Sequence, residues 1–309
     1  MSSVYLQNSS GSEMIHRPAV LLFALLSFPA LLAAQPADTP PASALRFLPG
    51  IPVSPRFTAD PEEPRSGIRK EFGTSRLKLD VGIAYDLLEW RPGNDSTRSL
   101  RLGTELFTYA LVMNANGRRL QADAADAFIG GHLLYMHRTD RDLAALRLRI
   151  LHLSAHFLDG HLGTGGNLWR EGREPIPFSR DYGELTHLWR RMTTRGHFQI
   201  YGGIAYATLI RPVEINRWSF LAGGEYADAK LAGTILGQPA HCYAAFHFTL
   251  AGIPAWIGTT HLEGGLRLGD WDRAGVRLYV NYQAGLDVFH QYYNVRGENW
   301  GGGIAFDLW

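Results

Sequence analysis

From residue 77 onward the chain repeats one pattern, in which apolar and polar residues alternate with a period of two. Five stretches show it cleanly, at 77–85, 197–206, 241–250, 261–268 and 276–283. Less regular stretches lie at 98–113, 126–138, 144–157, 180–192, 217–227 and 299–309. Because successive side chains of a strand point to opposite faces, the pattern predicts strands with one apolar and one polar face.

Many amphipathic strands in a row fit two architectures. A soluble sandwich buries the apolar faces, whereas a transmembrane barrel turns them to lipid and encloses the polar ones. The barrel is favoured because aromatic residues that suit interface girdles lie near the strand ends, at Trp90, Trp189, Trp218, Trp256 and Trp300. We predict an all-β fold, an antiparallel transmembrane β-barrel over residues 76–309. Bacterial single-chain barrels have even strand numbers, so about 12 strands are expected, with ten as the alternative.

The N-terminus predicts export. A short basic start at Met14 precedes an apolar run from Ala19 to Ala34 that ends in small residues, which is typical of a secretory signal peptide. We assign residues 1–34 to this signal, with Met14 as the expected true start. Residues 35–75, rich in Pro and Ala and then charged, predict a periplasmic linker. The expected location is the cell outer membrane.

The charge balance limits the partners. A net charge of +1 gives no basic face for nucleic acid. The expected partners are the lipids of the outer membrane and the machinery that assembles barrels. No metal site and no cofactor is predicted from the residues themselves.

The stretch Leu146–Gly160, LRLRILHLSAHFLDG, divides its polar residues between two faces. Arg147 and Arg149 share one face, and His152, Ser154 and His156 share the other. A charge on the lipid face costs about 2–4 kcal/mol at the midplane, so the arginines are expected in the lumen. The same reasoning predicts a lumen lined by Arg147, Arg149, Glu263, Arg267, Arg277 and Asn281. These charged side chains either line a pore for anionic solutes or pair with one another and close the lumen. The second arrangement is more common in small barrels, whose interiors fill with side chains.

Four stretches carry a family resemblance. ADPEEPR (Ala59–Arg65), DAFIGGHL (Asp126–Leu133), LRLRILHLSAHFLDG and the terminal YNVRGENWGGGIAFDLW resemble an uncharacterised family of bacterial outer-membrane proteins, known only as a domain of unknown function. That family has a second serine where this chain has Ala155, and Leu-Gly where it has Phe157-Leu158. The resemblance implies an outer-membrane barrel and no established activity. ADPEEPR predicts either a periplasmic plug or docking strand, or a solvated linker.

The His-x-Ser spacing is also similar to that of outer-membrane phospholipase A and the lipid A deacylases, which carry it on the outer barrel wall. By this resemblance Ser154 would be the nucleophile and His152 its general base. A third group must orient the histidine. Asn167 is the nearest match to the orienting residue of those families, and Asp159, Asp181 and Glu184 are the other candidates. His156 is a further candidate catalytic residue. Calcium enters as a cofactor only under this hypothesis.

Simpler interpretations of the three polar side chains stay open. In one, the three side chains form a hydrogen-bonded cluster at a strand end. In the other, a bulge turns the three side chains inward. Metal binding by His152 and His156 is disfavoured, because four residues of strand separate their Cα atoms by about 13 Å. The sequence thus predicts a structural or weakly permeable outer-membrane barrel. The alternatives are an outer-membrane lipid ester hydrolase and a soluble ligand-binding sandwich.

Overall fold

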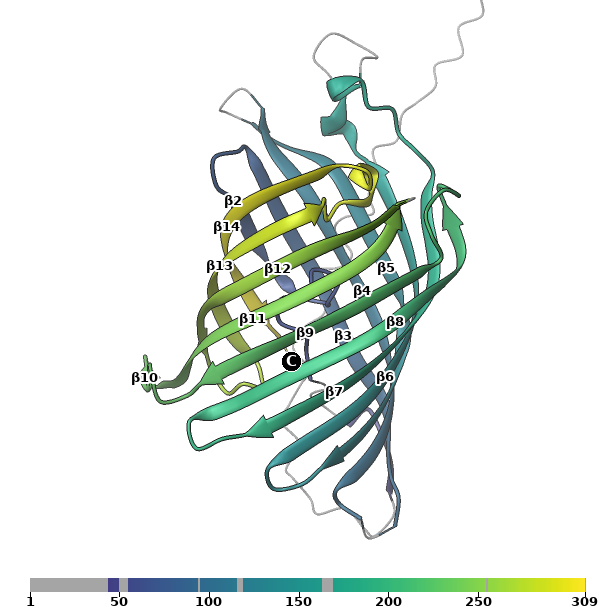
Figure 1. The fold of residues 1–309 in the computed structure, drawn as a ribbon. Coiled ribbons are helices and arrows are strands. Elements are labelled where there is room, and N and C mark those ends of the chain that lie inside the picture. Colours follow the sequence, from purple (N-terminus) through teal and green to yellow (C-terminus); the bar gives the residue numbers. More distant parts are fainter. Residues whose placement is uncertain are drawn as a thin grey trace, which may run out of the picture. The chain divides into compact units, whose positions relative to one another are not determined.

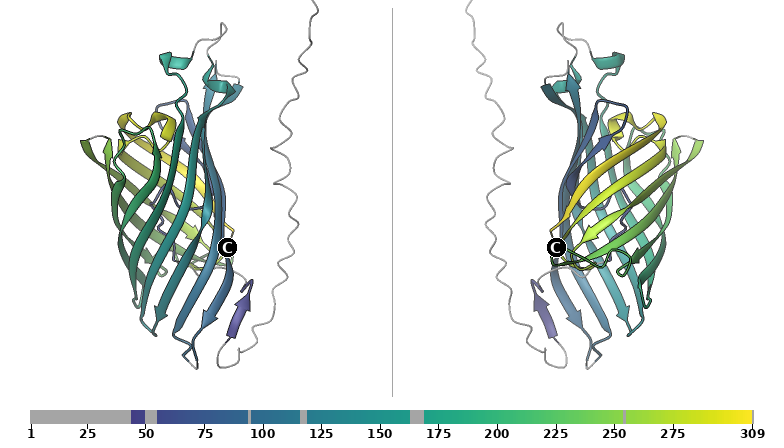
Figure 2. Two further views of the ribbon diagram at one scale, coloured as in Figure 1. Left: turned by 90° about the vertical axis from the view of Figure 1, so that its right-hand side faces the viewer. Right: turned by 90° about the vertical axis from the view of Figure 1, so that its left-hand side faces the viewer.

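The computed structural model describes residues 44–49, 55–93, 95–115, 119–162, 169–253 and 255–308 (Figures 1 and 2). All of them belong to one compact unit, Pro40–Trp309. The predicted signal peptide, residues 1–34, lies outside the described residues, as does Asn167. Among the residues described, no helix is both long and apolar enough to cross a bilayer.

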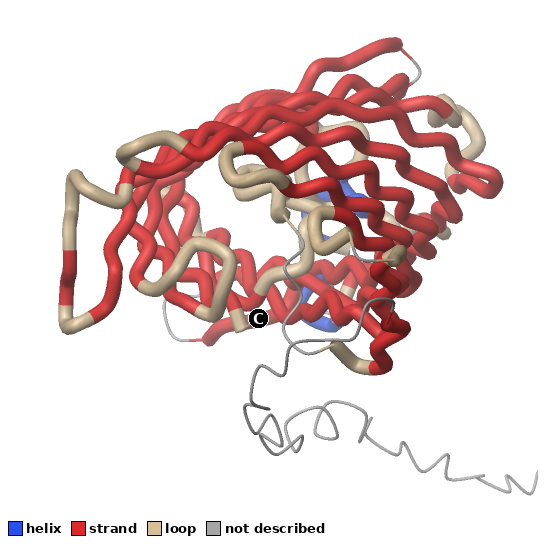
Figure 3. Tube along the Cα trace, turned by 90° about the horizontal axis from the view of Figure 1, so that it is seen from below, coloured by secondary structure: helices blue, strands red, loops and turns tan. Residues whose placement is uncertain are grey.

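Twelve antiparallel strands close into a barrel (Figure 3). They are β2 (Ser66–Glu71), β3 (Arg76–Arg91), β4 (Arg98–Ala115), β5 (Arg119–Arg138), β6 (Asp142–Phe157), β7 (Phe178–Met192), β8 (Gly196–Arg211), β9 (Trp218–Asp228), β11 (Gln238–Ile253), β12 (Ala255–Leu268), β13 (Gly275–Leu286) and β14 (Arg296–Asp307). Each strand pairs with its neighbours along this series, and β14 pairs with β2 to complete the ring. The predicted barrel and its strand number are confirmed, and the sandwich is excluded.

The strand that the sequence analysis missed is β2. The predicted linker, residues 35–75, includes Ser66–Glu71, which pairs with β14 on one side and β3 on the other. The barrel therefore begins at Ser66, and the boundary at residue 76 was wrong. The physical reason is that β2 is short and has a single large apolar residue, Ile68, so it shows no alternation. A further strand, β1 (Ala44–Phe47), pairs with the far end of β3.

The two faces of the wall have opposite character. Large apolar side chains are exposed on the outer face along the strands, among them Val81, Leu106, Ile129, Ile150 and Trp300. Their polar neighbours in sequence point inward and are buried. A monomeric protein in water rarely exposes so continuous an apolar surface, whereas a barrel in lipid requires one.

The two ends of the barrel differ, and we name them by what they carry. The loop end carries the long connection between β6 and β7, with η1 (Asp159–His161) and η2 (Arg170–Gly172). It also carries the β13–β14 connection with η3 (His290–Tyr292). The terminal end is the opposite one, where β14 finishes at Asp307; the loop end is uppermost in Figure 2.

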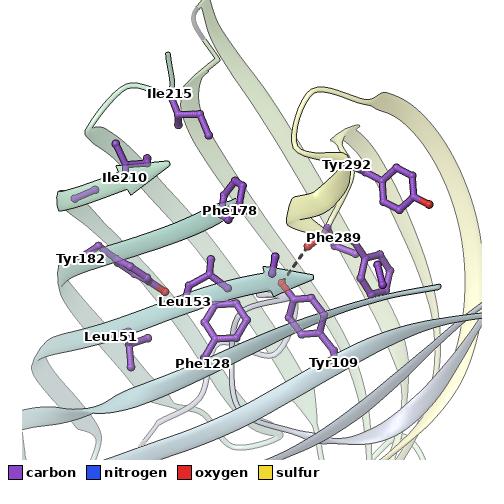
Figure 4. Close-up of a cluster of buried hydrophobic side chains, with 14 of the residues drawn as sticks. Tyr109, Phe128, Leu151, Leu153, Phe178, Tyr182, Ile210, Ile215, Phe289 and Tyr292 are labelled. Carbon is purple, nitrogen blue, oxygen red and sulfur yellow. Dashed lines mark hydrogen bonds between the residues drawn. The ribbon is translucent and has the colours of Figure 1, made fainter. Parts of the chain in front are cut away.

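Aromatic packing fills the lumen at the loop end (Figure 4). Tyr109, Phe128 and Phe289 pack together, and the Tyr109 hydroxyl donates a hydrogen bond to the Val288 carbonyl at 3.0 Å. Residues from the β13–β14 connection thus fold inward against β4 and β5. Apolar burial therefore stabilises this end. Elsewhere the buried residues include many charged and polar side chains and a smaller apolar cluster around Phe57, Leu134 and Tyr201.

Candidate functional site

Residues 55–65, which we call the plug segment, lie inside the barrel ahead of β2. Phe57, Ala59, Asp60, Glu63 and Arg65 are all buried. The plug segment contains the whole ADPEEPR stretch, Ala59–Arg65. This part of the chain is therefore enclosed by the wall and is not a solvated linker. Of the two predicted alternatives, the buried segment fits a plug.

The plug segment contacts both ends of the lumen. Phe57 stacks on Tyr201 of β8 with ring centroids 3.8 Å apart. Further along, the Glu62 carboxylate accepts a hydrogen bond from the Tyr182 hydroxyl at 3.1 Å and lies 3.7 Å from His290 of η3. Burial lowers the pKa of His290, but its hydrogen bond to Asp126 at 2.8 Å outweighs this effect and raises that pKa. The histidinium form is thereby favoured opposite Glu62.

Two arginines of β6 anchor the plug segment to the wall. Arg147 lies 2.6 Å from Glu63, and its guanidinium is 4.3 Å from the Phe57 ring centroid. Arg149 is fully buried, donates to the Glu62 carbonyl at 3.0 Å, and pairs with Glu105 at 2.7 Å. Removing one partner from such a buried pair leaves an uncompensated charge and costs about 3–5 kcal/mol.

The other predicted lumen residues also point inward. Arg277 pairs with Glu263 at 2.7 Å, and Arg267 hydrogen-bonds the Asp307 carboxylate. Asn281 is buried on β13. All six predicted lumen side chains are therefore buried in the interior, and each of the five charged ones has an oppositely charged partner.

The outer wall carries a separate polar group near the loop end. His152, Ser154 and His156 point outward from β6 and alternate with Leu151, Leu153 and Ala155, whose side chains are buried. Over its described length β6 pairs with β5 and β7 without a register shift. The bulge that would have turned these side chains inward is therefore not present in β6.

Two hydrogen bonds organise this outer group. His152 Nδ1 lies 2.6 Å from Asp181 Oδ1, and Ser154 Oγ lies 3.2 Å from His156 Nε2. Asp181 is directly opposite His152 in the β6–β7 register. Both members of the His–Asp pair are about half exposed, with side-chain exposures of 48% and 44%.

Asp181 sits at an irregularity in the sheet. The β7–β8 register shifts between Asp181 and Tyr182, which leaves Thr208 of β8 as an extra residue. The Thr208 hydroxyl donates to the Asp181 carbonyl at 3.2 Å. Bulges of this kind are enriched beside active sites, where they aim a side chain.

Ser154 has small neighbours on the outer face. Its direct neighbours across the ladders are Ala127 of β5 and Ser179 of β7, both small. Ser154 itself is half-buried. The hydroxyl can therefore be approached from outside the barrel.

The remaining candidates do not join this group. Asp159 lies in η1 beyond the strand end with its side chain exposed, and no hydrogen bond to His152 is found among the described contacts. Glu184 points inward to Arg147 and Arg149. Within the described part of the chain no three His, Cys, Asp or Glu side chains gather closely enough to hold a metal ion. Of the candidates that sequence reasoning left open, Asp181 is the one that hydrogen-bonds His152 among the described residues.

Comparisons with known proteins concern the fold. No family model and no curated protein matches the chain. The beta domain of the Bordetella autotransporter BrkA aligns at 13% identity over 78% of this chain and 95% of its own, with a TM-score of 0.42. OmpT, an outer-membrane protein of Vibrio cholerae, aligns at 10% identity over 78% and 94%, with a TM-score of 0.31. The resemblance to a family of unknown function stays a prediction.

Proposed function

We propose that this protein is an outer-membrane barrel that hydrolyses ester bonds of membrane lipids on its outer wall. Ser154 is the nucleophile, His152 the general base and Asp181 the residue that orients the base. The observation that carries the proposal is the 2.6 Å hydrogen bond between His152 and Asp181, with Ser154 two residues further along the same outward face. Nucleophile, base and orienting acid are the three parts that a hydrolytic triad needs.

The location of the group favours a lipid substrate. Bacterial outer-membrane barrels keep short turns in the periplasm and long loops outside, which makes the loop end the outer one. Ser154 lies three residues before the end of β6, about 10 Å along the strand. At that depth an outward side chain meets lipid near the bilayer surface, where acyl chains are esterified.

The reaction follows from the arrangement. Ser154 Oγ attacks the ester carbonyl carbon while His152 takes the hydroxyl proton. The carbon–oxygen bond to the leaving alcohol then breaks, and His152 returns the proton to that alcohol. A water molecule, deprotonated by the same histidine, hydrolyses the acyl-serine and releases the fatty acid. Asp181 stabilises the imidazolium formed in each half.

Two histidines flank Ser154 at equal spacing, and the acid distinguishes them. His152 is hydrogen-bonded to Asp181, whereas His156 is hydrogen-bonded to Ser154. An oriented imidazole is the better base because its tautomer is fixed. We therefore assign the base to His152, and to His156 the positioning of the Ser154 hydroxyl before the substrate arrives.

Calcium belongs to this hypothesis only by the resemblance. Among the described residues, no group of three or more His, Cys, Asp or Glu side chains is placed to hold a metal ion. No step of the reaction above uses one. The activity assay includes calcium and chelator arms for this reason.

The test is a hydrolysis assay on refolded protein in mixed micelles and in vesicles. Phospholipid and lipopolysaccharide are offered separately, each with calcium or with chelator, and released fatty acid is measured. We expect ester cleavage, and labelling of Ser154 by a sulfonyl fluoride, located by mass spectrometry. Ser179→Ala is the matched control, since Ser179 is the outward serine opposite Ser154. No cleavage and no labelling by correctly folded protein in every arm would refute the proposal.

A second candidate function, a structural or weakly permeable barrel, is favoured by the buried plug segment. The test is conductance in planar bilayers. We expect a closed wild type and an open channel after replacement of residues 56–65 by a Gly-Ser linker. Steady wild-type conductance would argue against closure by the plug segment, and lipid hydrolysis would show that the barrel is more than structural.

A further inference from the structure

A cavity of about 110 Å³ lies inside the barrel at the loop end. The plug segment supplies Pro61 and Glu62 to its lining. Much of the remaining lining is apolar, with Phe178, Ile210, Ile215, Ile253, Leu286 and Val288. Phe178, Ile210 and Ile215 are seen in Figure 4 as part of the buried cluster. The cavity is on the inner side of the wall, so its argument is independent of the hydrolysis proposed for the outer face.

The acids of this lining have partners of their own. One oxygen of Glu62 accepts a hydrogen bond from the Tyr182 hydroxyl at 3.1 Å, and the other lies 3.7 Å from Nε2 of His290. Asp287 pairs with Arg76 at 2.6 Å. Both carboxylates are therefore engaged with groups of the protein.

Arg180 is the cation of the lining that has no such partner. It points inward from β7 and is half-buried. Its guanidinium donates a hydrogen bond to Ser219 Oγ at 3.1 Å and lies 4.1 Å from the Tyr182 ring centroid. Among the described residues it forms no ion pair, and its other N–H groups have no acceptor. These donors are available to a ligand in the cavity.

The volume limits the size of the ligand. An apolar cavity of about 150 Å³ holds one benzene molecule, so this cavity suits an apolar group of about four to six carbon atoms. Ligand sites commonly combine an apolar lining with a few polar groups that fix the orientation. A guanidinium beside isoleucine side chains is such a combination.

The cavity reaches the surface at the loop end. Asn216, in the β8–β9 connection, belongs to the lining and is exposed. Tyr293, in the β13–β14 connection, also lines the cavity, and its hydroxyl donates a hydrogen bond to the exposed Glu214 at 2.6 Å. In the orientation argued above, a ligand enters here from outside the cell.

We propose that this cavity binds a small monocarboxylate with a short apolar tail. The carboxylate pairs with Arg180, because a guanidinium matches its two oxygens with parallel N–H donors. The tail packs against the apolar lining and leaves water. The ligand is a solute and not a fatty acid released from lipid, since the cavity is too small for a long acyl chain.

The experiment measures binding to the refolded full chain in lipid nanodiscs by calorimetry, with protein-free nanodiscs as the blank. Sodium hexanoate is compared with sodium acetate, which lacks the tail, and with hexan-1-ol, which lacks the carboxylate. We expect hexanoate to bind at least about tenfold more tightly than either. No binding of hexanoate, or equal binding of acetate or hexan-1-ol, would overturn the proposal. Dodecanoate is the arm for a lipid-derived acid, and tighter binding of dodecanoate than of hexanoate would overturn the assignment to a solute.

Variants locate the site. Arg180→Gln is expected to raise the hexanoate Kd at least about tenfold, because it removes a charge-assisted pair. Arg69→Gln is the matched control. Arg69 is also a half-buried arginine without an ion pair among the described residues, but it lines a different, smaller cavity. An equal loss of binding in both variants would contradict the site.

Ala251→Leu keeps the test decisive if Arg180→Gln does not fold. Ala251 lies in the lining, so the larger side chain occupies the space proposed for the tail. Hexanoate should bind at least about tenfold more weakly, since the tail loses its place in the cavity. An unchanged Kd in a folded Ala251→Leu protein would overturn the proposal.

Discussion

Strand β6 carries two polar groups that differ in the face they occupy, in their burial and in their partners. Arg147 and Arg149 point inward, are 6% and 0% exposed, and are held by Glu63, Glu105 and Glu184. His152 and Ser154 point outward, and each has one hydrogen bond among the described contacts. Each arginine of the inner group pairs with carboxylates, because a buried charge without a partner is strongly destabilising. Outside β6 the described contacts of the outer group include only the hydrogen bond between His152 and Asp181 of β7. Polar groups facing lipid are retained mainly where function needs them.

This contrast predicts that the two groups fail differently when altered. Ser154→Ala should lower the rate of lipid ester hydrolysis by about 10⁴-fold or more, because the variant lacks the proposed nucleophile. The urea midpoint and the heat-modifiable gel mobility should stay unchanged. Fatty acid release and urea titration of the same preparation measure both. Activity retained in a folded Ser154→Ala protein would remove Ser154 from the mechanism.

Arg149→Met tests the inner group. It leaves Glu105 and Glu184 buried without their shared cation, so the free energy of unfolding should fall by about 3–5 kcal/mol. Urea titration in vesicles measures the change. His152→Asn is the matched outward variant and should shift stability by less than about 0.5 kcal/mol. Equal effects of the two variants would mean that the outer group is structural as well.

The barrel was predictable because a period of two records both faces of every long strand. The same rule predicts Arg147 and Arg149 on the opposite face from His152, as the structure has them. It failed at Ser66–Glu71, where six residues with one large apolar side chain contain too little pattern. It could not place the plug segment either, because that segment is buried by tertiary contacts and has no repeat of its own.

The candidate site was only half predictable. His152 and Ser154 are close in sequence, and strand geometry puts them on one face. Asp181 comes after a long connection, and its place opposite His152 depends on the register between β6 and β7. The register depends on where β6 ends, where β7 begins and which of their residues pair. None of these can be read from the sequence alone. Asp159, nearer in sequence, proved to lie past the strand end.

Asp181→Asn measures how much of the outer group depends on that register. Loss of a triad acid costs about 10⁴ in kcat when the acid is buried, and screening at this half-exposed site should reduce the cost to about 10²-fold. KM should change little, since Asp181 does not touch the substrate. Asp181→Glu should recover part of kcat. A fall confined to KM would show that Asp181 serves substrate binding and not orientation of His152.

The smallest expected effect separates the two histidines. His156→Asn keeps a hydrogen-bonding group beside Ser154, so hydrolysis should fall by less than about tenfold, the scale of one neutral hydrogen bond. His152→Asn removes the general base and should cost about 10²–10⁴-fold. Measuring both rates at one substrate concentration below KM compares them directly. The reverse order would move the base to His156, leaving the His152–Asp181 pair as a surface contact. The division between a structural inner face and a reactive outer face would then rest on Ser154 and His156 alone.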